Sequence, residues 1–170
     1  MTFNYDRSLE YYLQNSLRHS FRNSTIGIEK FPDLISFPIH HVYGVMSQLS
    51  WQDKRGSEYR SEIGYEELQR LQSNIKVIHE RTGHDIEVIK DLISRAKRVF
   101  FLGFGYAQEN LDVLDLPNVF KKNQQIFGTA IGFTEKERRE IIKKLRRPKI
   151  IAEPIIEIKM DCLTLLREYL

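Results

Sequence analysis

Two polar side chains near the start of the chain have types and a spacing that suit acid–base chemistry. Asn4 and Asp6 alternate within Thr2-Phe3-Asn4-Tyr5-Asp6, which is expected to be a short β-strand, so both side chains would point to one face. There an amide can bind a sugar hydroxyl or hold a water, and a carboxylate can orient that group or act as a base. The alternative is that Asn4 and Asp6 cap the helix that follows, and spacing alone favours this second interpretation.

A second pair, His41 and Tyr43, ends the next expected strand, which lies within 34–43 and begins after Pro38. Alternation along a strand places both side chains on one face. A histidine there can act as an acid or base near neutral pH, although a half-buried, hydrogen-bonded histidine is the commoner outcome. We expect no metal site, because the other histidines lack ligand spacing and Cys162 has no cysteine partner.

A glycine turn follows a third expected strand. Gly103-Phe104-Gly105 lies between the apolar run 99–102 and a helix over 109–116. Glycines there let the backbone approach a ligand, and helix amides can face an anion. A full dinucleotide fingerprint would need a glycine at position 108, which is Gln108. On the residues alone, a structural turn and a ligand contact are equally weighted.

These residues need a scaffold, and hydrophobic periodicity predicts one. The first helix, 8–17, has Leu9, Tyr12, Leu13 and Leu17 as its apolar positions. Thr134 and Glu137 form a capping box that opens a basic helix. Pro117 is expected to end the helix over 109–116. The further expected elements are helices over 65–81, 86–97, about 134–147 and about 160–170, a strand over 125–131, and a loop over 22–33; segment 75–78 fits a strand equally well.

Strands that alternate with helices predict an α/β fold, a three-layer Rossmann-like parallel sheet with helices on both faces. One domain over 1–170 is the simplest organisation. In such sheets ligands bind beyond the carboxyl ends of the strands, where Asn4, His41 and the Gly103 turn would meet.

Composition narrows the classes of function. The 170 residues are 41% hydrophobic and include one cysteine, which excludes a disulfide scaffold and a disordered chain. No apolar run approaches the roughly 20 residues of a membrane span, and no signal segment opens the chain, so a cytoplasmic protein is expected. The net charge of +3 is concentrated in 135–149, with eight basic and three acidic residues. No aromatic residues interleave with them, so nucleic acid is not an expected partner.

Three segments together resemble bacterial sirtuin-like domains, in the divergent branch that includes NAD-cleaving antiphage proteins. They are 2–10 (TFNYDRSLE), 41–44 (HVYG) and 101–106 (FLGFGY) followed by Asn110, and the resemblance spans about 2–132. It implies that Thr2, Asn4 and Asp6 lie beside the nicotinamide ribose. It further implies that Gly103, Phe104 and Gly105, with Asn110, contact the adenosine ribose.

The chain departs from the family pattern in two places, and both affect the function that the resemblance implies. Tyr43 stands where the family has its catalytic histidine, so a base is either missing or supplied by His41. The family's first strand and glycine loop, which hold the pyrophosphate, would precede Thr2. We therefore expect a chain truncated at its N-terminus relative to the family, whose bare sheet edge is completed by another chain or by a homo-oligomer.

The implied function is NAD binding, with cleavage of the nicotinamide–ribose bond by a hydrolase of the NAD glycohydrolase class, in bacterial antiphage defence. Asn4 would position water or the ribose, Asp6 would orient the ribose, and His41 or Tyr43 would accept a proton. The alternative is a non-catalytic, degenerate module without NAD turnover, in which the basic helix contacts a partner protein.

Overall fold

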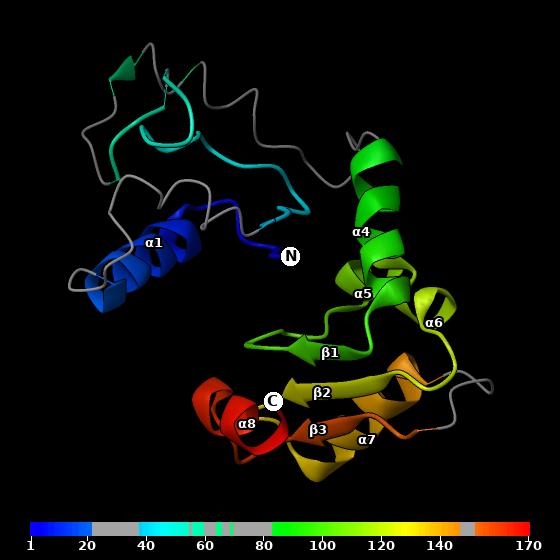
Figure 1. The fold of residues 1–170 in the computed structure, drawn as a ribbon. Coiled ribbons are helices and arrows are strands. Elements are labelled where there is room, and N and C mark those ends of the chain that lie inside the picture. Colours follow the sequence, from blue (N-terminus) through cyan, green and yellow to red (C-terminus); the bar gives the residue numbers. More distant parts are fainter. Residues whose placement is uncertain (22–37, 55, 60–63, 66–68, 70–82, 147–151) are drawn as a thin grey trace. The chain divides into compact units, whose positions relative to one another are not determined.

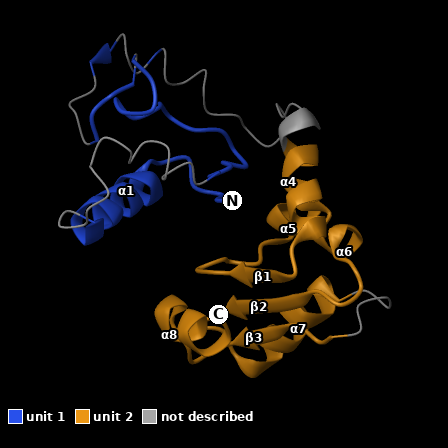
Figure 2. Cartoon of the chain, in the orientation of Figure 1, with its two compact units in different colours: residues 1–82 blue, residues 83–170 orange. Residues whose placement is uncertain are grey.

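The structure of this chain, a computed structural model, describes residues 1–21, 38–54, 56–59, 64–65, 69, 83–146 and 152–170. The chain divides into two compact units, Met1–Thr82 and Gly83–Leu170 (Figures 1 and 2). This division does not by itself test the expectation of one domain over 1–170, which stays a prediction. The expected loop over 22–33 and nearly all of the expected helix over 65–81, with its alternative strand at 75–78, lie outside the described residues.

The second unit is built around a parallel sheet (Figure 1). Its strands are β1 (Arg98–Phe101), β2 (Gln125–Thr129) and β3 (Ile155–Glu157), in the order β1-β2-β3. Its helices are α4 (Gly83–Arg95), α5 (Gln108–Leu114), α6 (Leu116–Val119), α7 (Glu135–Leu145) and α8 (Cys162–Tyr169). The α/β prediction is confirmed at this level, as are the strands expected at 99–102 and 125–131. β3 is an element that the sequence analysis misses.

Aromatic packing shows which residues cover the two faces of this sheet. Phe100 and Phe127 are paired across β1 and β2 and stack at 4.9 Å, and Phe127 stacks on Tyr169 of α8 at 4.7 Å. Phe101 points to the opposite face, where it meets Phe120 just after α6 at 6.4 Å. The sheet therefore has aromatic cover on both faces.

Side chains that cap helices fix the ends of several elements. The predicted capping box is confirmed, since Thr134 accepts a hydrogen bond from the Glu137 amide and Glu137 accepts one from the Thr134 amide. Gln124 is only 4% exposed and donates to the carbonyls of Ile93 and Ala96 at the end of α4, at 2.7 and 2.6 Å. These bonds supplement the backbone hydrogen bonds at the end of the helix, where the last carbonyls have few partners within it.

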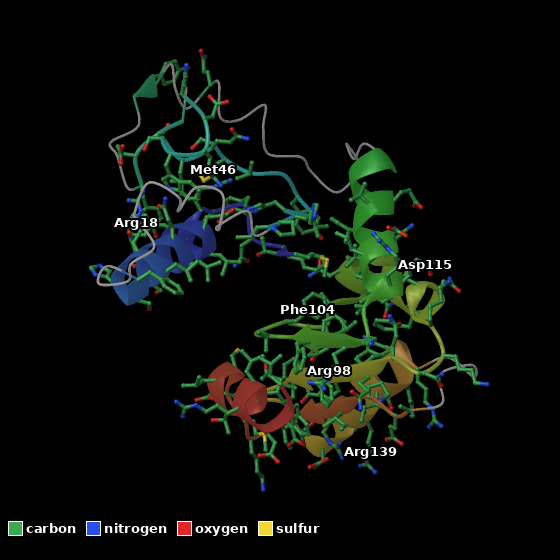
Figure 3. All side chains as sticks on the ribbon, viewed as in Figure 1. Arg18, Met46, Arg98, Phe104, Asp115 and Arg139 are labelled. Atoms are coloured by element: carbon green, nitrogen blue, oxygen red, sulfur yellow. The ribbon has the colours of Figure 1, made fainter. Side chains whose placement is uncertain are left out.

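The helix expected over 109–116 is divided, and Pro117 does not end it. Asp115, labelled in Figure 3, ends α5. Its backbone is left-handed, with φ 48°, and Pro117 lies in the first turn of α6. Proline is tolerated there because the first amides of a helix need no partner within it.

The first unit contains α1 (Ser8–Phe21), which confirms the first expected helix and extends it. The strands expected at 2–6 and 34–43 do not form within the described residues. One isolated parallel bridge joins Thr2 to His41. Short polar side chains bond to nearby amides instead: Thr2 Oγ1 accepts from Asn4 N at 3.1 Å, and Asp6 Oδ1 accepts from Ser8 N at 2.8 Å. Such local bonds compete with strand pairing.

None of the helices that the structure describes combines the length and the apolar character that a membrane span requires.

Candidate functional site

The buried face of helix α1 is a stripe of polar side chains. Arg7 at its N-terminal boundary, Glu10 and Gln14 are 8, 4 and 5% exposed, whereas Leu9 and Tyr12 are 49 and 54% exposed. The apolar face expected from Leu9 and Tyr12 is therefore not the buried one. Charged residues are almost never fully buried unless they are paired, so the stripe identifies a polar cluster in the first unit.

His41 lies at the centre of this cluster. Its side chain is 6% exposed, with Nε2 2.5 Å from Oε1 of Glu10 and Nδ1 2.6 Å from the backbone oxygen of Asn4. The Asn4 carbonyl only accepts, and an ionised Glu10 only accepts, so this pattern is complete when both ring nitrogens carry hydrogen. In this arrangement His41 has no free ring nitrogen to offer a substrate.

Glu10 is held by charge as well as by hydrogen bonding. Burial alone would raise the pKa of Glu10, but the hydrogen bond with His41 and the charge of Arg7 outweigh burial and lower this pKa below the ordinary glutamate value. Arg7 Nη2 lies 3.5 Å from Glu10 Oε1 and also donates to the side-chain oxygen of Gln52. The cluster thus joins α1 to two segments that are distant in the sequence.

Asn4 presents its amide side chain from a backbone that is held on both sides. Its N–H donates to Thr2 Oγ1 and its carbonyl accepts from His41. Asn4 is exposed, and its side chain makes no hydrogen bond with any other part of the chain that the structure describes. This geometry leaves the amide available to a ligand.

The capping interpretation is confirmed for Asp6 and not for Asn4. Asp6 accepts from the first amide of α1, and its hydrogen bonds with Ser8 lower the pKa of its carboxyl group. Tyr43 packs edge-on against Phe3 with ring centroids 5.7 Å apart. Because residues 42–43 form a turn, strand alternation no longer relates His41 to Tyr43. The first unit thus brings Asn4 and His41 into contact.

The glycine turn lies in the second unit, directly after β1. Gly103 has φ +60°, and its N–H donates to Thr129 Oγ1 at 3.0 Å, so this amide is not free for an anion. Phe104 stacks on Phe101 at 5.4 Å. A Cβ placed on Gly103 or Gly105 would meet nothing within 4 Å, which leaves space beside the turn. Asn110 lies half-buried in the first turn of α5.

Tyr106 is a residue that the sequence analysis does not single out. It adopts φ 52°, is 3% exposed, and donates through its hydroxyl to the Thr129 carbonyl at 3.3 Å. Burial raises its pKa. A Cβ on Gly128 would lie 2.1 Å from this hydroxyl oxygen. A glycine inside a strand signals such a close approach, and Gly128 is that signal in the sequence.

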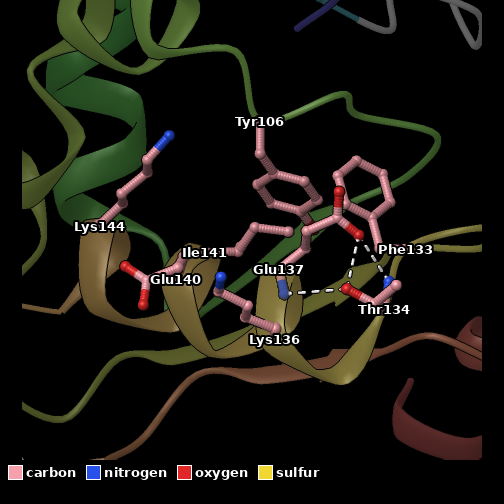
Figure 4. Close-up of a pocket in the computed structure, with 8 residues that line it drawn as sticks. All are labelled: Tyr106, Phe133, Thr134, Lys136, Glu137, Glu140, Ile141 and Lys144. Carbon is pink, nitrogen blue, oxygen red and sulfur yellow. Dashed lines mark hydrogen bonds between the residues drawn. The ribbon is translucent and has the colours of Figure 1, made fainter.

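A pocket of about 430 Å³ lies beside Tyr106 (Figure 4). The rings of Tyr106 and Phe133 meet edge-on at 6.3 Å, and Ile141 of α7 adds apolar surface. Lys136 and Lys144 also line it. Because Tyr106 follows β1 and Phe133 follows β2, the pocket lies at the carboxyl ends of the strands, where parallel sheets bind ligands. Its lining combines aromatic and apolar surface with two ammonium and two carboxylate groups. The other lining residues are Thr134, Glu137 and Glu140.

Within the described residues, no three His, Cys, Asp or Glu side chains are grouped as a metal ion would require. Comparison of the chain with protein-family models, with curated proteins and with solved structures gave no significant match.

Proposed function

We propose that this chain is a sirtuin-like NAD-binding protein with a Rossmann-like three-layer fold, and that it hydrolyses the bond between nicotinamide and ribose. The observation that carries the proposal is the Asn4 amide, exposed on a backbone that Thr2 and His41 hold in place. The held backbone fixes the point from which this amide projects, and an amide can orient a water or a ribose hydroxyl. A cytoplasmic role in bacterial antiphage defence is the proposed setting, and it rests on the resemblance.

The proposed reaction breaks the bond from ribose C1′ to the pyridinium nitrogen, which keeps the electron pair, so nicotinamide leaves as a neutral molecule. The oxygen of a water held by Asn4 bonds to C1′ of the oxocarbenium-like centre, and the water's proton passes to solvent. Asp6, whose Oδ1 accepts from the Ser8 amide, orients the ribose through the other oxygen of its ionised carboxylate. His41 acts as a positioning residue for Asn4, because both of its ring nitrogens are already hydrogen-bonded.

Within the second unit, taken by itself, the pocket beside Tyr106 is proposed to bind a nucleotide. Its aromatic rings offer surface for a flat base, and the Lys136 and Lys144 ammonium groups offer charge to phosphate. In the same unit, the open space at Gly103 and Gly105 supports a close approach of a ribose of that nucleotide.

The test is nicotinamide release from NAD, followed by chromatography, with the full chain and two variants. Asn4→Ala is expected to abolish release while the thermal unfolding midpoint changes little, because the Asn4 side chain has no partner among the described residues. Asn15→Ala on α1 makes the same chemical change elsewhere and is expected to keep wild-type release. Equal turnover in Asn4→Ala and wild type would remove Asn4 from the mechanism, and no release by the wild type would refute the hydrolase.

A second candidate is a module that binds a nucleotide without turnover. The internal use of the Gly103 amide and of both His41 nitrogens favours it, because these groups are then not offered to a substrate. In the described sheet β1 also has one edge without a strand partner, which another chain can pair. A rise in the unfolding midpoint with NAD but no nicotinamide release would support this candidate.

A further inference from the structure

Two buried charged atoms in the polar cluster of α1 lack hydrogen-bond partners. Within the residues that the structure describes, Arg7 Nε and Glu10 Oε2 are both inaccessible to solvent and both unpaired. Arg7 is 8% exposed and Glu10 is 4% exposed. An unsatisfied buried group costs about 1–3 kcal/mol, and more when it is charged. Two such groups in one ion pair therefore indicate that something binds to both.

The two unpaired atoms belong to charged groups that are in contact with each other. Arg7 Nη2 is 3.5 Å from Glu10 Oε1, and each free atom is bonded to the same carbon as one of these two. Nη2 is also bound to Gln52 and Oε1 to His41, so those atoms are occupied while Nε and Oε2 are not.

The chemistry of the two atoms defines the missing group. The Arg7 Nε–H can only donate a hydrogen bond, and an ionised Glu10 Oε2 can only accept one. A cation would be repelled by Arg7, and an anion would be repelled by Glu10. A group that satisfies both must accept on one side and donate on the other, which is the property of a hydroxyl oxygen.

We propose that Arg7 Nε and Glu10 Oε2 together bind one hydroxyl oxygen, supplied either by an internal water or by a sugar. Buried waters commonly occupy such positions between otherwise unsatisfied polar groups. A sugar hydroxyl makes the same two bonds, and it is a component of the ligand class proposed above. The site stands on these two atoms and does not depend on NAD hydrolysis.

A crystal structure of the full chain that resolves ordered waters tests the site. The expected result is an oxygen within hydrogen-bond distance of both Arg7 Nε and Glu10 Oε2. Bonding of these two atoms to a protein group, or an empty space between them, overturns the proposal. Crystals soaked in D-ribose identify the source: replacement of the oxygen by a ribose hydroxyl assigns a sugar site, and an unchanged oxygen assigns an internal water. Neither result depends on nicotinamide release, so failure of the proposed function is recognised separately.

A solution measurement gives an independent test. Magnetic relaxation dispersion of water counts long-lived internal waters, and Arg7→Lys removes the Nε donor while it keeps the charge. We expect this variant to lose one such water, and Arg18→Lys, at an exposed arginine of the same helix, to lose none. Retention of every long-lived water in folded Arg7→Lys contradicts the proposal. Should that variant fail to fold, the crystal structure of the wild type still decides.

Discussion

His41 and Glu10 form a buried pair, with Nε2 2.5 Å from Oε1, across 31 positions of the sequence. This pair links α1 to the segment that follows Pro38, and through the other ring nitrogen it fixes the Asn4 backbone. The position of the Asn4 backbone, from which the proposed ligand-binding amide projects, is thus determined through His41 by a carboxylate of α1.

Replacing Glu10 with glutamine is expected to lower the free energy of unfolding at neutral pH by about 2 kcal/mol, because a hydrogen bond with a charged group contributes roughly this amount. Urea denaturation measures the change. Glu109→Gln, at an exposed position of α5, is the matched control and is expected to stay within about 0.5 kcal/mol of wild type. A Glu10→Gln variant as stable as the control would show that the pair contributes little.

Stability is expected to depend on pH through Glu10. Because its pKa is lower in the folded chain than in the unfolded chain, ionised Glu10 stabilises the fold above the ordinary glutamate pKa. That contribution is lost as the pH falls through the lowered folded value. Below about pH 4, the free energy of unfolding should fall more steeply for wild type than for Glu10→Gln. Denaturation series at several pH values provide the slopes, and parallel slopes would disprove the linkage.

Gly128→Ala is expected to destabilise the second unit by about 1–3 kcal/mol, the usual cost of overpacking a core. The added Cβ would lie 2.1 Å from the Tyr106 hydroxyl oxygen. Tyr106→Phe removes that oxygen, so the double variant should lose less stability than the two single changes predict, and a double-mutant cycle measures this coupling. Gly105→Ala adds the same group in open space and should be nearly neutral. Additive effects in the cycle would argue against the contact.

Gln124→Met is expected to cost about 2 kcal/mol, because it leaves the carbonyls of Ile93 and Ala96 without their side-chain donor. Thermal unfolding measures the loss. In the Gln124→Met variant, hydrogen exchange should show faster opening at the end of α4 than at α7. The neighbouring Gln125→Met, at an exposed position, is the control. Equal thermal unfolding midpoints for Gln124→Met and Gln125→Met would mean that the hydrogen bonds of Gln124 do not stabilise the fold.

The secondary structure of the second unit is predicted better than that of the first, because the signals that define it lie close together in the sequence. Ile89 and Ile93 of α4 lie at helical spacing and are buried, and the unbroken apolar run 99–102 indicates β1. Thr134 with Glu137 identifies the start of α7. β3 escapes prediction because three residues are too short to show a period.

The first unit is predicted less well because distant partners determine it. The inward stripe of α1 depends on His41 and Gln52, which the spacing of Leu9 and Tyr12 cannot reveal. Alternation at Asn4 and Asp6 suggests a strand, but their neighbours bond locally and turn the backbone. The contact between Asn4 and His41 nevertheless brings together two residues that the sequence singles out.

The parallel pairing of the sheet has a consequence for the rate of folding. Arg98 pairs with Gln125, and Phe127 pairs with Ile155, so each strand pair must close a long crossover before its first ladder bond forms. Such non-local contacts slow the search for the native state. We expect α7, with its own capping box, to gain structure early, and β3 to join the sheet only after α7 has formed.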